Sequence, residues 1–214
     1  MRHVFVETNW VVAYAAPAHH RIPAALKLFY RAAKRELRLY LPVICIAEAR
    51  RPISAFQSRN QADRVRQFLL WARDECVVNA GEDETTRRVL DLMEGREKAD
   101  LGRLDDAFQT LKAAEGIEIF NLSQQMLERC ADLSYLKLGL QPFDQAILAA
   151  ILVRGEQLLS EVADDIAFCE VDSDLQPWDK DQNRMERLAE LYDKVRIWVY
   201  GDFLLQAPAK PREW

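Results

Sequence analysis

Acidic side chains that follow apolar stretches are the residues of this sequence with the clearest capacity for chemistry. Five acids either have this placement or open a predicted helix: Glu7, Glu48, Asp144, Asp172 and Asp174. Each alone is weak evidence, because Asp and Glu number 34 among 214 residues and most carboxylates are solvated. If several converged, they would repel one another, and a hard cation such as Mg²⁺ or Mn²⁺ would relieve that repulsion. Two such ions can stabilise the attacking and leaving oxygens of phosphodiester cleavage.

Composition and motifs argue against other kinds of site. Half of the residues are hydrophobic and 29% are charged, which is typical of a globular chain. The seven glycines lie at least seven residues apart, so no phosphate-binding glycine loop can be written. The three histidines, His3, His19 and His20, belong to no zinc pattern, and the four cysteines form no C-x-x-C pair and are expected to be reduced. Carboxylates remain the abundant catalytic groups.

Short apolar stretches alternate with helical patterns over most of the chain. The predicted strands cover residues 4–6, 37–43, 117–122, 166–171 and 196–200. Predicted helices between them cover 24–38, a segment that starts after a Ser123 cap, and 142–153. This alternation predicts an α/β fold, a three-layer α/β/α arrangement around a mostly parallel sheet of about five strands. Ligands of such sheets bind outside the carboxyl ends of the strands, where several of the acids fall.

Residues 54–114 interrupt this alternation. They contain helical patterns at 61–76, 83–95 and 101–114 and no convincing strand, which predicts a helical insertion. We therefore expect a single domain over residues 1–205 that contains the insertion, followed by a loose tail at 206–214. The longest apolar runs, such as 146–153, reach eight residues, too short for a bilayer, and no secretory leader is evident. The expectation is a cytoplasmic protein without membrane contact.

Charge is distributed unevenly along the chain. Residues 1–73 hold thirteen Lys and Arg against four acids, whereas the remainder holds sixteen against thirty. An arginine-rich block favours a polyanionic partner, since the guanidinium group suits phosphate. Glu7 and Glu48 are two of the only four acids in that block. Arg50 and Arg51, directly after Glu48, would either clamp a phosphate group or be ordinary exposed helix charges.

Four segments in this order resemble the motifs of the PIN-domain ribonucleases, a family that includes toxin nucleases of bacterial toxin–antitoxin pairs. They are Glu7-Thr8-Asn9, the segment 41–48 that ends at Glu48, the segment 143–149 that contains Asp144, and the segment 170–175. The resemblance implies a PIN-like fold and a metal-dependent endoribonuclease. It also implies RNA as substrate, an antitoxin or other protein as partner, and a homodimer.

The same resemblance assigns roles to individual residues. Glu7, Glu48, Asp144 and Asp172 would hold Mg²⁺ or Mn²⁺ directly or through water, and Asp174 would be a secondary ligand. Asn9 and Thr8 would support these carboxylates by hydrogen bonds. The chain departs from the family pattern where Glu7 replaces Asp, Glu170 replaces Thr and Leu175 replaces Phe.

Two alternatives remain open at the level of sequence. The longer side chain of Glu7 could shift or abolish the metal site, which would leave a catalytically silent PIN-like module that binds RNA or a protein. A carboxylate-rich phosphohydrolase with an aspartyl nucleophile is a further alternative.

Overall fold

The computed structural model describes residues 1–16, 21–55, 59–75, 77, 80–161, 166–171, 174–179, 181 and 183–206. Within the helices it describes the backbone alone at 51–55, 59–63, 80, 83, 96–97 and 100–101. The predicted tail thus lies outside the described residues, apart from residue 206.

A parallel sheet forms the centre of the molecule. Its strands are β1 (Arg2–Val6), β2 (Leu37–Pro42), β3 (Ile117–Phe120), β4 (Ile166–Cys169) and β5 (Ile197–Tyr200), in the order β3-β2-β1-β4-β5. Every neighbouring pair of strands is parallel. The predicted α/β fold with about five strands is therefore confirmed, and each strand falls on its predicted stretch.

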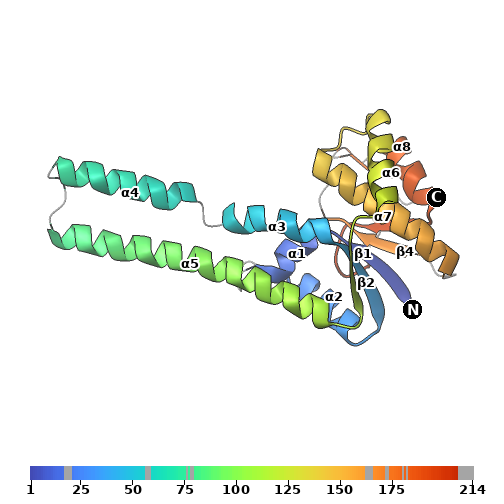
Figure 1. Ribbon diagram of the computed structural model, residues 1–214, viewed down its shortest axis with the longest axis horizontal. Coiled ribbons are helices and arrows are strands. Elements are labelled where there is room, and N and C mark those ends of the chain that lie inside the picture. The colour runs from blue at the N-terminus through green and yellow to red at the C-terminus, as the bar shows by residue number, and fades with distance from the viewer. Residues whose placement is uncertain are drawn as a thin grey trace.

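Helices cover both faces of this sheet (Figure 1). The connections from β1 to β2 and on to β3 carry α1 (Thr8–Ala15), α2 (Pro23–Ala33), α3 (Val43–Ala55), α4 (Arg59–Asp74) and α5 (Ala80–Ala113). The connections to β4 and β5 carry α6 (Gln124–Tyr135), α7 (Pro142–Glu161) and α8 (Glu186–Lys194). Strands β2 and β3 are added on one side of β1, whereas β4 and β5 are added on its other side. Right-handed crossovers therefore place the two sets of helices on opposite faces of the sheet.

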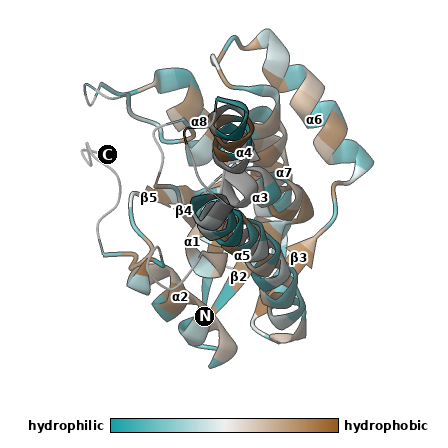
Figure 2. Ribbon diagram, turned by 90° about the vertical axis from the view of Figure 1, so that its left-hand side faces the viewer, coloured by the Kyte–Doolittle hydropathy of each residue, from teal (hydrophilic) through white to brown (hydrophobic). Residues whose placement is uncertain are grey.

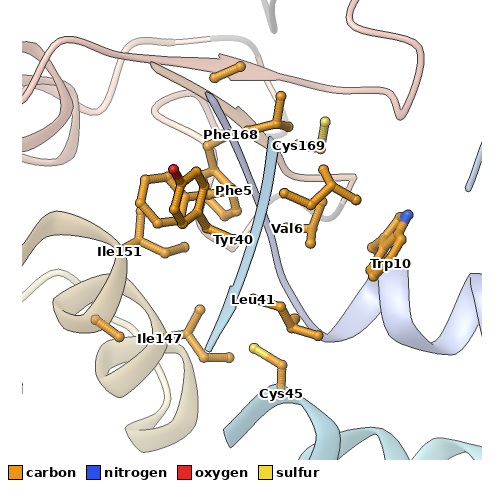
Figure 3. Packing of buried hydrophobic residues seen from close by; sticks show 14 of the residues in the cluster. Phe5, Val6, Trp10, Tyr40, Leu41, Cys45, Ile147, Ile151, Phe168 and Cys169 are labelled. Carbon is orange, nitrogen blue, oxygen red and sulfur yellow. The ribbon is translucent and has the colours of Figure 1, made fainter. Parts of the chain in front are cut away.

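The core explains why these stretches become strands. Phe5 pairs in register with Tyr40 on one side and with Phe168 on the other, so three aromatic side chains form a row that faces α7 (Figure 3). The next residues along two of these strands, Val6 and Cys169, are also paired and point to the opposite face. Both faces of the sheet are thus buried, as continuous apolar strands require.

The predicted helical insertion is a long hairpin. Helix α4 and the first half of α5 project away from the sheet, and Figure 2 looks along them. The predicted break between 95 and 101 is wrong, because α5 is continuous through Gly95 and Gly102. An interior glycine costs a helix only about 1 kcal/mol, which packing can offset. The later half of α5 packs on the body through the buried Leu104 and Leu111.

Two further helix predictions need correction at their ends. The helix expected over 24–38 ends at Ala33, because Arg35 has a φ of 59° and Leu37 already belongs to β2. The helix expected over 142–153 continues to Glu161. The Ser123 cap is confirmed, since its hydroxyl accepts the N–H of Met126 at 3.3 Å. Within the described part of the chain, no helix combines the length and apolar character needed to cross a bilayer.

Candidate functional site

The carboxyl ends of β1 and β4 bring two glutamates together. Val6 and Cys169 are paired in register, so Glu7 and Glu170, the next residues of two adjacent parallel strands, are neighbours. Only 4% of Glu7 and 1% of Glu170 is exposed. The strand order reverses its direction at this point, since β2 and β4 lie on opposite sides of β1. Open α/β sheets bind their ligands at such a switch point.

Local hydrogen bonds fix the first predicted motif. The carboxylate of Glu7 caps α1, where its Oε1 accepts the backbone N–H of Asn9 at 2.8 Å. The hydroxyl of Thr8 donates to Oε2 of Glu48 and thereby connects the start of α1 to α3. Thr8 thus contacts Glu48 through its side chain, and Asn9 contacts Glu7 through its backbone N–H, while the supporting roles of both at a metal site stay predictions.

These residues line a pocket of about 730 Å³ at the carboxyl edge of the sheet. Its lining consists of Glu7, Thr8, Asn9, Glu48, Gln141, Pro142, Phe143, Asp144, Glu170, Asp174 and Leu175. Asp144 is the third residue of α7, and Asp174 follows β4 and is exposed. Four of the five predicted acids thus line one pocket, although they come from separate segments of the chain. Their catalytic roles stay predictions.

The remaining predicted residues are placed differently. Asp172 lies outside the described residues, as does the side chain of Arg51. Arg50 does not line the pocket, and its guanidinium forms an exposed ion pair with Asp105 of α5. The hypothesis of a phosphate clamp therefore has no geometric support at Arg50.

The pKa of a buried thiol, that of Cys45, reflects the negative charge around this site. Cys45 lies one helical turn before Glu48 and is completely buried. Loss of solvation raises the pKa of the Cys45 thiol well above its ordinary value, and the negative charges of Glu7, Glu48 and Glu170 raise it further. The hydrogen bond with Thr8 lowers it in part. Glu7, Glu48 and Glu170, which come from three separate segments of the chain, thus all lie near the Cys45 thiol. Cys45, Cys130 and Cys169 are free thiols, as predicted, and Cys76 lies outside the described residues.

The donor atoms of the pocket suit a hard cation. Its described lining residues include five carboxylates and two side-chain amides but no Lys, Arg or His, and such oxygen donors are those that Mg²⁺ and Mn²⁺ prefer. Among the described residues, no group of three or more Asp, Glu, His and Cys is spaced to hold one ion. Mg²⁺ commonly keeps several waters and uses one or two carboxylates, and this pocket has room for a hydrated ion. The residues therefore fit an ion held largely through water.

Sequence reasoning left Glu170 out of the predicted site. It was noted only as a replacement for Thr beside the site, yet it is the most deeply buried acid of the pocket. Its backbone is fixed on both sides, because its N–H donates to the carbonyl of Tyr200 and its carbonyl accepts from Gln176. The available signal was the one that identified Glu7, an acid directly after an apolar strand. Phe143 and Gln141, beside Asp144, were also missed.

Several arginines of the basic first third form ion pairs within the chain. Arg35, Arg38 and Arg66 form ion pairs with acids from the later, acidic part of the chain, namely Glu115, Glu118 and Glu94. The asymmetry of charge along the sequence is therefore partly cancelled in space. These three arginines therefore give no separate support to the prediction of a polyanionic partner.

Comparison with protein-family models, with curated proteins and with solved structures gives no match to this chain. The case for a function thus depends on the motifs and on the geometry of the pocket.

Proposed function

We propose that this protein is a PIN-like, metal-dependent endoribonuclease that cleaves RNA phosphodiester bonds at the carboxylate pocket. The observation that carries the proposal is the convergence of Glu7, Glu48, Asp144 and Asp174 on one pocket at the switch point of the sheet. A cluster of acids in a cleft is costly unless it serves a ligand, and it marks a candidate functional site.

A bound ion and the residues of the pocket would have different roles. Bound Mg²⁺ or Mn²⁺ would supply a charge that neutralises the phosphate and favours attack by water. The chain itself holds the carboxylates in place, since the α1 cap orients Glu7 and the Thr8 hydroxyl orients Glu48. Without a cation the acidic lining repels phosphate, so RNA should engage this pocket only when metal is present.

Two observations favour a second candidate, a silent PIN-like module that binds RNA or protein. The carboxylate of Glu7 already accepts a hydrogen bond as the cap of α1, and the described acids form no three-residue cation group. Such a module would bind its partner without metal-dependent turnover.

Cleavage assays on structured and unstructured RNA, with Mg²⁺, Mn²⁺ or EDTA, separate the two candidates. Asp144→Asn should reduce metal-dependent cleavage at least about 100-fold, because loss even of an outer partner of a metal site costs about 10- to 100-fold. The matched control is Asp91→Asn, an exposed residue of α5 that does not line the pocket. Equal cleavage by Asp144→Asn and wild type would contradict the nuclease proposal. RNA binding without cleavage in any metal would favour the silent module.

A further inference from the structure

Helix α2 and the residues beside it are basic in a chain whose net charge is −5. Residues 21–38 hold six Lys and Arg against a single acid. Three of these arginines form ion pairs with acids, namely Arg31, Arg35 and Arg38. Lys27 and Lys34 are both exposed and form no ion pair with any part of the chain that the structure describes. Their charges are therefore available to a partner.

The two lysines and one tyrosine lie on the same side of α2. Lys27, Tyr30 and Lys34 follow at intervals of three and four residues, which places them on one helix face, and we call them the α2 stripe. The two lysines are separated by about 10 Å along the helix axis. Tyr30 lies between them and is 58% exposed. The edge of its ring contact with Phe29, at 5.5 Å between centroids, supports the ring from the side of the body.

The opposite side of α2 is committed to the core. Ala25, Leu28 and Ala32 are completely buried, so α2 cannot turn an apolar side into a bilayer as an interfacial helix does. The α2 stripe offers a partner two cations with one aromatic ring between them. Unpaired nucleic acid matches this pattern, because its phosphates bind cations and its bases stack on aromatic rings.

The α2 stripe is separate from the carboxylate pocket. None of its three residues lines the pocket. Lys34 lies three residues before Leu37, the first residue of β2, and therefore at the amino edge of the sheet, whereas the pocket lies at the carboxyl edge. Six residues of strand separate the two edges by about 20 Å. The stripe thus attracts phosphate without a metal ion, which the acidic pocket cannot do.

We propose that the α2 stripe anchors an unpaired stretch of RNA outside the pocket. Lys27 and Lys34 bind phosphate groups, and the ring of Tyr30 stacks on a base. The choice of RNA as the polyanion rests on the proposed function, but the anchor requires neither metal nor cleavage. A strand held here raises the concentration of its other nucleotides near the pocket, as a linked second binding site does.

RNA binding in EDTA tests the proposal with the full chain. In about 50 mM NaCl, wild type should bind an unpaired RNA of about 20 nucleotides, and Lys27→Ala/Lys34→Ala should weaken this binding at least about tenfold. The matched control is Lys98→Ala/Lys194→Ala, which removes two exposed lysines from α5 and α8. Both double variants should keep the wild-type circular dichroism spectrum. Absence of RNA binding by wild type in EDTA, or equal weakening by the two double variants, would overturn the proposal.

Salt dependence and Tyr30 test the two kinds of contact separately. Each phosphate contact adds about 0.7 to the slope of log affinity against log salt for single strands, so Lys27→Ala/Lys34→Ala should lower this slope by about 1.4. Tyr30→Ala should weaken RNA binding at least about fivefold, and Tyr30→Phe should restore it. Inorganic polyphosphate has no bases, so Tyr30→Ala should bind it as wild type does. Equal loss of RNA and polyphosphate binding in Tyr30→Ala would exclude the stacking contact.

Two further outcomes separate this proposal from its alternatives. Binding of vesicles that contain phosphatidylserine, without binding of RNA, would assign the α2 stripe to a membrane surface and overturn the proposal. Because the assay contains no metal, its result does not depend on cleavage. RNA binding through the stripe by a protein that cleaves nothing would contradict the nuclease alone, and cleavage unaffected by a stripe that binds no RNA would contradict the anchor alone.

Discussion

Phe5 in β1 and Leu69 in α4 are both buried, but their surroundings differ. Phe5 lies in the central strand of the sheet, and the cluster that surrounds it draws on all five strands and on helices of both faces. Among the residues that the structure describes, Leu69 clusters with Leu90, Val65 and Met93, all within the hairpin. The body therefore provides an extensively packed frame for the carboxylate pocket, whereas the hairpin is held together by a small cluster of its own, and we expect it to open more readily than the sheet.

Charged side chains show the same contrast. In the hairpin, Arg66 and Glu94 are each about half exposed and are paired with each other, which is the usual fate of surface charges. In the body, Glu7 and Glu170 are buried next to one another at a pocket whose described lining offers no basic residue. The carboxylate pocket, rather than the exposed ion pairs of the hairpin, is therefore the candidate for catalysis.

The largest expected effect on stability distinguishes the core of the sheet body from the small cluster of the α4–α5 hairpin. Phe5→Ala should lower the free energy of unfolding by about 3–5 kcal/mol, because it removes a large side chain from the centre of the body. Leu69→Ala should change the main unfolding transition little and should instead accelerate hydrogen exchange in α4 and the first half of α5. Chemical denaturation and hydrogen exchange measure the two effects. If Leu69→Ala lowered the main transition as much as Phe5→Ala does, the hairpin and the body would unfold as one unit.

The hydrogen bond from Thr8 to Glu48 can be tested for its contribution to the pocket. Thr8→Val keeps the shape of the side chain but removes the hydroxyl that donates to Glu48. We expect Mn²⁺ affinity, measured by calorimetry, to fall about 10- to 100-fold, as is usual when the partner of a metal ligand is removed. Thr86→Val is the control, since the Thr86 hydroxyl donates only to the backbone carbonyl of Glu82 in the hairpin. Unchanged Mn²⁺ affinity in Thr8→Val would show that this hydrogen bond does not organise the site.

The buried thiol of Cys45 predicts that the free energy of unfolding depends on pH in the alkaline range. Burial and the nearby glutamates raise the pKa of Cys45 in the folded state, whereas in the unfolded chain a thiol has a pKa of about 8.5. Above that pH the unfolded chain loses a proton that the folded protein keeps, so stability falls as pH rises, by up to about 1.4 kcal/mol per pH unit for this group. Burial also raises the pKa of Tyr192, which adds to the decline at higher pH.

Urea unfolding at pH 8 and pH 10 measures this dependence. Cys45→Ala should make the decline shallower, and Cys130→Ala, at a partly exposed thiol of α6, should alter it less. Identical slopes in wild type and Cys45→Ala would contradict the assignment.

The smallest expected effect comes from glycines in the two regions. At Gly95 in α5 an added Cβ meets nothing within 4 Å, so Gly95→Ala should stabilise the hairpin by about 0.5–1 kcal/mol. Gly139, between α6 and α7, has equally open space but a φ of +75°, so Gly139→Ala should destabilise the body by about 1 kcal/mol. Thermal melts and hydrogen exchange compare the two. Effects of the same sign would show that backbone conformation does not decide the outcome.

Much of the fold was predictable because its signals are local. Five apolar stretches become the five strands, and the Ser123 cap starts α6 as expected. Glu7 and Glu48, which the sequence singled out because they follow apolar stretches, both line the pocket. The break near Gly95 was predicted wrongly, because the penalty of an interior glycine is smaller than the stabilisation from packing and hydrogen bonding along a long helix.

Contacts between distant segments could not be predicted in the same way. The ion pair between Arg50 and Asp105 depends on α5 returning past α3, and no local pattern in either segment indicates it. The adjacency of Glu7 and Glu170 depends on β4 pairing with β1 in one particular register. A shift of one residue would turn Glu170 to the other face of the sheet.

The sequence alone thus determined the strands and helices of this protein and the acids that stand beside them, because burial of apolar side chains at a regular period is a property of the local chain. The tertiary structure decided which acids share a pocket and which arginines are neutralised. It also decided which apolar side chains of the hairpin remain exposed. These outcomes depend on the order and register of the strands and on the pairing of α4 with α5, which are set by packing between segments far apart in the sequence.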